Sequence, residues 1–328
     1  MTLARFLQLD ATKLSPDGRL RFIALLLFPA LIGHAIQLTG EDSPGTAMAM
    51  ARYWTTPGWH LALPPWLVTG FALGLALTMV GLLLRRTRRW LLALIAFYVA
   101  HYFTYPFRIR NHMSMMLASL VAVGGVIALG RIAGLKNRSF IDRYAIRGVA
   151  MVLVITYMSA SLHKMNDGFL GPYSSAIQGV DAFFASGGLG GEAPSWARAI
   201  AIYGTLVVEA TLPLFALVLP RFSSVFVIAL MLFHFPHVAV MNVADYPMIA
   251  STFYPALFRR EEWDRLEPFL LRPSRVTLAG GAIGISAQLW FIPSSEALTL
   301  FGVFVTALWG WWSAAILQMM WAARRKEP

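Results

Sequence analysis

The chain has 328 residues, of which 58% are hydrophobic and only 13% are charged, and its formal net charge is +11. This composition excludes a soluble globular protein, because too few polar residues remain to cover a surface in water. Cysteine is absent, which excludes disulfides, thiolate metal sites and CxxC redox chemistry.

Apolar runs of helical length recur along the whole chain. Nine of them approach the roughly 20 residues that a helix needs to cross the hydrocarbon core of a bilayer. A tenth segment, residues 246–258, is short and carries Pro247 and Pro255, so we expect it to cross as a broken helix or to dip in and return. In chain order, the long runs are residues 20–39, 66–84, 90–105, 112–130, 146–163, 197–219, 222–241, 275–293 and 298–322.

The positive charges between these runs predict the topology. Lys and Arg in short loops are retained on the cytoplasmic side, and here basic segments alternate with segments that are poor in positive charge. The alternation holds along the chain only if residues 246–258 complete a crossing. We therefore predict an all-α, polytopic helical bundle of the inner membrane, with about ten crossings and both termini inside. The net charge follows from this orientation and does not indicate nucleic acid as a partner.

All seven histidines fall on the predicted outer side, in outer loops or in the outer halves of helices. One interpretation is that imidazole, like Trp and Tyr, tolerates the membrane interface. The other is a polar site, open to the outside, that handles protons or binds a metal. The histidines are His34, His60, His101, His112, His163, His234 and His237.

Two of these histidines have polar neighbours at the predicted outer interface. Asn111 and His112 begin the fourth crossing, and His163 and Lys164 close the fifth. A lysine at a helix end ordinarily extends its amine to the interface, but a partly buried amine loses proton affinity and can act as a general base. These residues alone leave both interpretations of Lys164 open.

Glu209 is an ionisable residue inside an apolar run, roughly 18 Å from the outer end of its predicted helix. A carboxylate at that depth costs several kcal/mol unless it is paired or protonated, so such residues face the bundle interior. Pro213 stands four residues further on and cannot donate to the Glu209 carbonyl. We expect Glu209 either to be functional or to form a structural bond between helices.

Polar residues also gather in the stretch FHFPHVAVMNVADYP. His234, His237, Asn242 and Asp245 lie there around prolines, where a broken helix supplies unpaired backbone groups to a ligand. The HxxH spacing places both imidazoles on one helical face, which suits a metal. Pro236 disturbs that geometry, and no second HxxH or ExxH motif completes a two-metal set. We therefore expect no metal.

Together these stretches resemble a known family. The segments RNHMSMMLASL, YMSASLHKMNDGFLGPYSSAI, VVEATLPLF and FHFPHVAVMNVADYPMIASTFYPALFRREEW are similar, in order and spacing, to the vitamin K-dependent γ-carboxylase and its wider superfamily, the horizontally transferred transmembrane (HTTM) domain proteins. The likeness covers roughly residues 20–265. It implies a membrane core in residues 1–265, followed by two additional transmembrane helices in residues 266–328.

The resemblance also implies an activity. Lys164 would deprotonate a reduced quinone of the vitamin K or menaquinol type, and Asn111 and His112 would assist at the quinone oxygen. His163, which precedes Lys164, would also belong to the catalytic residues. Quinol epoxidation with O2 would then be coupled to carboxylation by CO2 or to another modification, on the periplasmic side. The expected cofactor-binding residues are Tyr157, Glu209, His234, His237 and Asn242.

Two other functions remain open from the sequence. In the first, the chain would be a non-catalytic accessory protein for the maturation or export of a secreted peptide. In the second, it would be a His-metal or proton-coupled membrane protein that uses Glu209. The halves of the chain show no inverted repeat of the transporter kind. The expected partners are the lipid bilayer, a lipophilic quinol and, in the accessory interpretation, a secreted peptide or protein.

Overall fold

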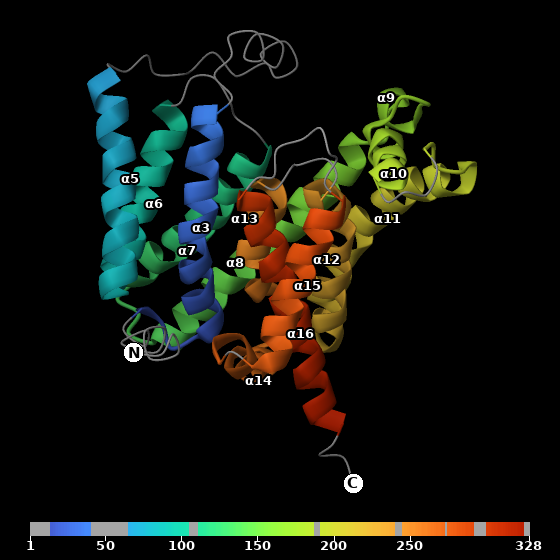
Figure 1. Cartoon of the computed structure of the whole chain (residues 1–328). Helices are drawn as coiled ribbons and strands as arrows, with labels where there is room; N and C mark the ends of the chain where they lie inside the picture. Colours follow the sequence, from blue (N-terminus) through green and yellow to red (C-terminus); the bar gives the residue numbers. More distant parts are fainter. Residues whose placement is uncertain are drawn as a thin grey trace. The chain divides into compact units, whose positions relative to one another are not determined.

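The fold is helical throughout the part of the chain that the structure describes (Figure 1). The structure is a computed structural model, and it describes residues 14–40, 65–104, 111–186, 191–239, 245–272, 274–291 and 300–324. The chain divides into two compact units, residues 5–152 and residues 153–328, and the boundary lies within helix α8 (Arg138–His163). The prediction of an all-α protein is confirmed.

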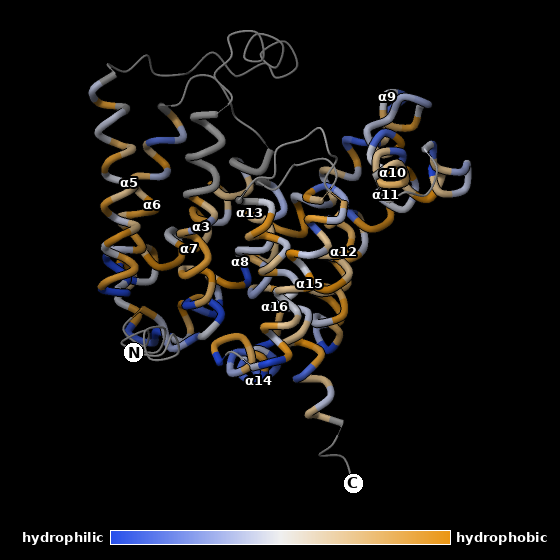
Figure 2. The backbone as a smooth tube through the Cα atoms, viewed as in Figure 1, coloured by the Kyte–Doolittle hydropathy of each residue, from blue (hydrophilic) through white to orange (hydrophobic). Residues whose placement is uncertain are grey.

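Over its described residues, each of the nine long apolar runs lies on a helix, because a backbone in hydrocarbon must satisfy its own hydrogen bonds within the segment. Hydrophobic residues follow these helices along their length (Figure 2). Five described segments are long and apolar enough to cross a membrane, so the chain has the helices of a membrane protein; the count of ten crossings and their orientation remain predictions. The five are Ser114–Ile132, Arg138–His163, Ser195–Val218, Pro220–Ala239 and Gly302–Ala323.

Within its described residues, the unit of residues 5–152 contains four complete helices and the first part of α8. Its helices α5 and α6 form a tight hairpin with a two-residue connection, in which Arg86 adopts a left-handed backbone with φ of 46°. Gly81 lets the two helices approach, since a Cβ there would lie 2.3 Å from the ring of Trp90. The helices are α3 (Gly18–Gly40), α5 (Pro65–Arg85), α6 (Arg88–Thr104) and α7 (Asn111–Ile132).

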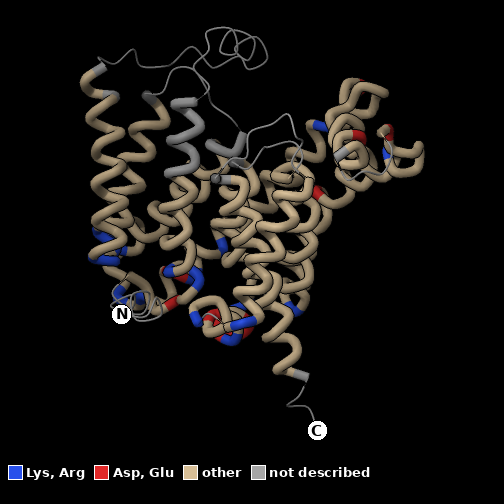
Figure 3. The backbone as a smooth tube through the Cα atoms, viewed as in Figure 1, with Lys and Arg blue, Asp and Glu red and all other residues tan. Residues whose placement is uncertain are grey.

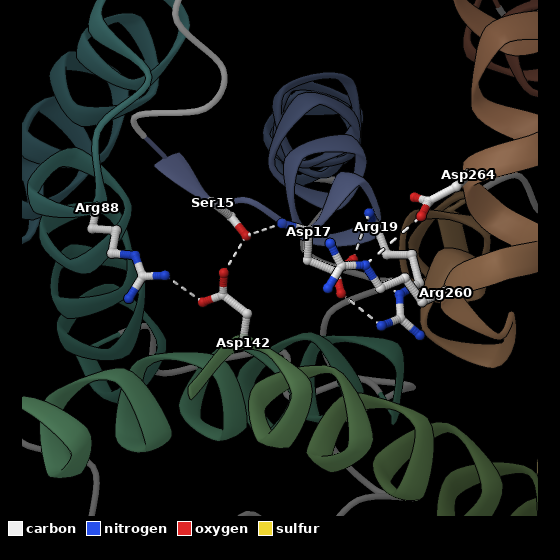
Figure 4. A network of polar contacts seen from close by, with 7 residues as sticks. All are labelled: Ser15, Asp17, Arg19, Arg88, Asp142, Arg260 and Asp264. Atoms are coloured by element: carbon white, nitrogen blue, oxygen red, sulfur yellow. Dashed lines mark hydrogen bonds and ion pairs between the residues drawn. The ribbon is translucent and has the colours of Figure 1, made fainter. Parts of the chain in front are cut away.

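A buried polar network holds one end of this unit together (Figure 4). Arg88 at the start of α6 places Nη2 2.5 Å from a carboxylate oxygen of Asp142 in α8, and its Nε donates to the Leu14 carbonyl at 2.9 Å. The Ser15 hydroxyl donates to the other oxygen of Asp142. Asp17 in turn accepts two bonds from the Arg19 guanidinium. The segment before α3 is therefore fastened to the starts of α6 and α8.

The unit of residues 153–328 contains the end of α8 and all later helices. The short segment at residues 246–258 is an α-helix that tightens into a 3-10 turn at Tyr254, where Pro255 lacks the N–H needed to continue it. The segment is thus helical and broken at Pro255, while its crossing of the membrane remains a prediction. The elements are α9 (Asp167–Leu170), α10 (Ser175–Ser186), α11 (Ser195–Val218), η1 (Pro220–Phe222), α12 (Ser223–Ala239), α13 (Asp245–Phe253), η2 (Tyr254–Leu257), α14 (Arg260–Leu271), α15 (Arg275–Phe291) and α16 (Leu300–Arg324).

Helices α15 and α16 pack through glycines. A Cβ on Gly284 would lie 2.0 Å from the Thr306 carbonyl oxygen, and one on Gly310 would lie 2.0 Å from the Gly280 carbonyl oxygen. Such close backbone approach is typical of helix pairs in membranes, where small residues at the interface permit extensive van der Waals contact. The backbones of α15 and α16 therefore lie in direct contact at these glycines.

Helix α14 is amphipathic and short. Trp263, Leu266 and Leu270 are buried along one face, while Arg260 and Glu261 on the other are exposed. Figure 3 shows both signs of charge concentrated on this helix. A helix with a basic and acidic face opposite an apolar one suits the plane of a membrane interface better than its interior.

Candidate functional site

Lys164 follows directly after the last residue of α8, at a turn that the sequence HKMND builds. Asn166 caps α9, since its side-chain oxygen accepts from the Phe169 N–H at 3.0 Å, and its amide donates to the His163 carbonyl at 2.6 Å. The Lys164 N–H still bonds back to the Ala160 carbonyl at 3.1 Å. Hydrogen bonds before and after Lys164 therefore fix the position of its Cα atom.

The Lys164 amine pairs with Glu209 of α11. Its Nζ lies 2.5 Å from each carboxylate oxygen, and the side chains are 27% and 6% exposed, respectively. Ser161, one turn earlier on α8, donates to the Leu206 carbonyl of α11 at 2.9 Å and so holds the two helices side by side. The carboxylate expected deep in an apolar helix thus has a cation as its partner, and the lysine belongs to an ion pair and not simply to the interface.

A second group of polar side chains is buried behind this pair. The Tyr157 hydroxyl and His234 Nε2 share a hydrogen bond of 2.7 Å, and the Tyr157 hydroxyl also lies 3.1 Å from that of Tyr254. Tyr157 and Tyr254 are 0% exposed and His234 is 2% exposed. Within the described residues, His234 Nδ1 is buried and has no hydrogen-bond partner. The group therefore holds an imidazole in a fixed orientation with one ring nitrogen unengaged.

The two groups are close enough to interact electrostatically. The positive charge of Lys164 acts on both His234 and His237, and the negative charge of Glu209 acts on Tyr246. The His234 ring lies 5.6 Å from that of His237 and 5.3 Å from that of Tyr246. We call these residues the polar cluster: Tyr157, Lys164, Glu209, His234, His237, Tyr246 and Tyr254.

The HxxH pair differs from its expected geometry. Helix α12 continues through Pro236 as far as Ala239, so His234 and His237 lie on a regular helix. They do not meet a third ligand there: among the described residues, no group of three or more His, Cys, Asp or Glu side chains could hold a metal ion. The chemistry of the cluster is that of amine, carboxylate, imidazole and phenol groups.

Helix α10 and the start of α11 are joined by a surface ion pair. The Arg198 guanidinium donates to both carboxylate oxygens of Asp181, at 3.0 and 2.8 Å, and Asp181 also accepts from the Ala193 N–H. Hydrogen bonding to Arg198 holds the pKa of Asp181 below its usual range, although desolvation opposes the shift. The pair fastens α10 to the start of α11.

Three predicted site residues are not tested by this geometry. Asn111 and His112 lie in the first turn of α7, at the end opposite Arg131, and their side chains are outside the described part of the structure. Asn242 also lies outside the described residues. His163 is described, and it is exposed at the end of α8.

Sequence reasoning missed Tyr246, Tyr254 and Ser161. The available signal for the tyrosines was chemical: a buried tyrosine hydroxyl needs a hydrogen-bond partner, and the short apolar segment of residues 246–258 contains both tyrosines. That signal predicts a partner without saying which residue supplies it.

Comparison with known proteins gives no independent guide to this cluster. No family model matches the chain, and no curated protein or solved structure matches it. Its function is therefore inferred from the arrangement of its side chains and from the motifs that contain them.

Proposed function

We propose that the chain is a membrane enzyme of the γ-carboxylase-like superfamily that acts on a reduced, lipophilic quinone with O2, at a site on the periplasmic side of the inner membrane. The observation that carries the proposal is the contact of Lys164 with both oxygens of Glu209, within electrostatic reach of the buried imidazole of His234. The motif HKMND, from which the resemblance predicts the base, supplies the lysine of that contact.

The ion pair supports a role for Lys164 as a base. An amine can accept a proton only after losing one, and Glu209 is placed to take it across the 2.5 Å contact. Partial burial favours this transfer, because it replaces two desolvated charges by two neutral groups. The neutral Lys164 amine then takes the proton of a quinol hydroxyl, while Glu209 retains the first proton.

The buried imidazole supports recognition of the same ligand. His234 Nδ1 has no partner within the described residues, and Tyr157 at Nε2 fixes the plane of the ring. That nitrogen can hydrogen-bond a ligand oxygen, because Tyr157 engages Nε2 and leaves Nδ1 available. When bound, the quinol and O2 supply the oxidative chemistry, with CO2 as co-substrate where the product is a carboxylate.

Quinol-dependent oxygen uptake tests the proposal. The purified full chain in lipid nanodiscs is supplied with reduced menaquinone or reduced vitamin K, and quinol consumption and O2 uptake are followed together. We expect turnover by the wild type and by Lys136→Ala, which changes an exposed lysine, and none by Lys164→Ala. Absence of O2 uptake by the wild type with every quinol tested would contradict the proposal and favour the accessory role.

A further inference from the structure

A cleft of about 680 Å³ lies at the end of the unit of residues 5–152 where α5 turns into α6. Five arginines line it, together with Trp90: Arg85, Arg88, Arg89, Arg131 and Arg138. They come from the end of α5, the start of α6, the end of α7 and the start of α8, so residues far apart in sequence form one basic surface. Lys and Arg collect at this end of α5 in Figure 3.

The positive charge of this cleft is largely uncompensated. Asp142 is bonded to Arg88 and to Ser15, so its carboxylate is fully engaged. The other four arginines make no ion pair within the part of the chain that the structure describes. Arg131 and Arg138 are close enough for their charges to act on Arg88. An anion in the cleft would relieve this repulsion.

Helix ends strengthen the preference for an anion. Helix α6 begins at Arg88 and α8 begins at Arg138, and neither has an acidic residue in its first turn. The first N–H groups of a helix lack partners within it and carry a partial positive charge. At the start of α8 the Phe140 N–H already donates to the Asn137 side chain, so the start of α6 is the freer of the two ends. That helix end and the four guanidiniums without ion pairs together suit a phosphate, which guanidinium groups bind with paired hydrogen bonds.

The side chains around the cleft are apolar and exposed, which favours a phosphate that carries acyl chains over a free phosphate. Leu84 is 74% exposed next to Arg85, while Leu129 and Ile132 are 66% and 83% exposed on either side of Arg131. Trp90, in the cleft itself, is a residue typical of the membrane interface. A free phosphate would leave these apolar side chains uncovered, whereas lipid tails would cover them.

We propose that this cleft binds the head group of an anionic phospholipid, with its phosphate between Arg89 and Arg131 and its acyl chains along the exposed apolar faces of α5 and α7. Basic pockets between transmembrane helices are a recognised form of lipid head-group site. The inference concerns the unit of residues 5–152 and is independent of the chemistry at Lys164.

Lipid binding to the purified full chain tests the proposal. Native mass spectrometry measures the occupancy of cardiolipin, phosphatidylglycerol and phosphatidylcholine, with inorganic phosphate as competitor, at several salt concentrations. The double variant Arg89→Gln/Arg131→Gln removes two arginines from the cleft. The matched control is Arg143→Gln/Arg147→Gln, which removes two exposed arginines of α8 that do not line it.

We expect an anionic lipid to bind the wild type and the control equally, and to bind the cleft variant about 30-fold more weakly, given the contribution of each arginine near a charged lipid. Binding should weaken as salt rises. Equal binding of phosphatidylcholine, or an equal loss in both double variants, would overturn the proposal. Full displacement by millimolar inorganic phosphate would overturn the lipid assignment and show a site for free phosphate.

Discussion

The Nζ atom of Lys164 lies 2.5 Å from both carboxylate oxygens of Glu209, although 45 residues separate them in the chain. The pair joins the end of α8 to the middle of α11, and the charge of Lys164 reaches the imidazoles of His234 and His237. It satisfies an ionisable residue inside an apolar helix and gives the lysine a partner with which to exchange a proton. Stability and the proposed chemistry therefore depend on the same contact.

Loss of either partner should destabilise the protein more than loss of both. Lys164→Met leaves the Glu209 carboxylate without its cation, at a cost of about 3–5 kcal/mol. The double variant Lys164→Met/Glu209→Met replaces the pair by apolar side chains and should lie within about 1–2 kcal/mol of the wild type. Denaturation of the four proteins in detergent provides the double-mutant cycle.

The cycle contains its own control. If the two single substitutions were simply additive, the contact between Lys164 and Glu209 would not contribute to folding. The interpretation of the cluster as a coupled pair would then have to be abandoned.

Tyr157 should matter through its hydroxyl group. Tyr157→Phe removes the hydrogen bonds to His234 and Tyr254 inside a fully buried site, at a cost of about 1–3 kcal/mol. Tyr203→Phe, at an exposed position on α11, is the matched control and should be nearly neutral. Thermal unfolding of both variants measures the difference, and equal stability of the two would contradict a structural role for the Tyr157 hydroxyl.

The packing of α15 on α16 should not tolerate a methyl group at Gly284. In Gly284→Ala the new Cβ would lie 2.0 Å from the Thr306 carbonyl oxygen, so the helices must separate, at a cost of about 1–3 kcal/mol. Gly125→Ala is the control, because nothing lies within 4 Å of its Cβ and alanine favours a helix by about 1 kcal/mol. The two substitutions should shift the unfolding temperature in opposite directions.

Glu262 should make stability depend on pH. Burial raises its pKa above the ordinary value of 4.5, while hydrogen bonds from the Ser224 hydroxyl and N–H oppose the shift. Because the pKa is higher in the folded state, protonation of Glu262 stabilises the fold. This contribution is complete below the unfolded-state pKa and is lost as the pH rises through the raised value.

Glu262→Gln should therefore gain on the wild type as the pH rises, by a few degrees in unfolding temperature. The amide oxygen can still accept from Ser224 without carrying a charge. Glu261→Gln, at the exposed neighbouring position, is the charge-matched control. Unfolding curves from acidic to neutral pH measure both, and an advantage of Glu262→Gln that shrinks with rising pH would show that the sign is wrong.

The helices could be predicted from the sequence because their signals are local. Apolar runs of sufficient length form helices in lipid whatever their neighbours, and Pro255 ends the short helix α13 by removing an N–H. Even so, α12 continues through Pro236 to Ala239, because a proline removes one hydrogen bond from a transmembrane helix and neighbouring groups can compensate for it. Whether a proline breaks a helix depends on neighbouring groups that the sequence does not place.

The site could be predicted only residue by residue. Lys164, Glu209 and His234 each stood out as polar groups in apolar surroundings, but their contacts depend on how α8, α11 and α12 rotate about their axes. Those rotations are set by packing over the whole unit, including small contacts such as the bond from Ser161 to the Leu206 carbonyl. For the same reason, Tyr254 did not emerge as a partner of Tyr157.

Quinol oxidation by Lys164→Arg tests the central claim most directly. Arginine can preserve the ion pair with Glu209 and hence the fold, but its guanidinium does not give up its proton near neutral pH. We predict a variant that unfolds within a few degrees of the wild type and shows no quinol-dependent O2 uptake. A folded Lys164→Arg protein with wild-type turnover would contradict the account, because a base that cannot lose its proton cannot take one from the substrate.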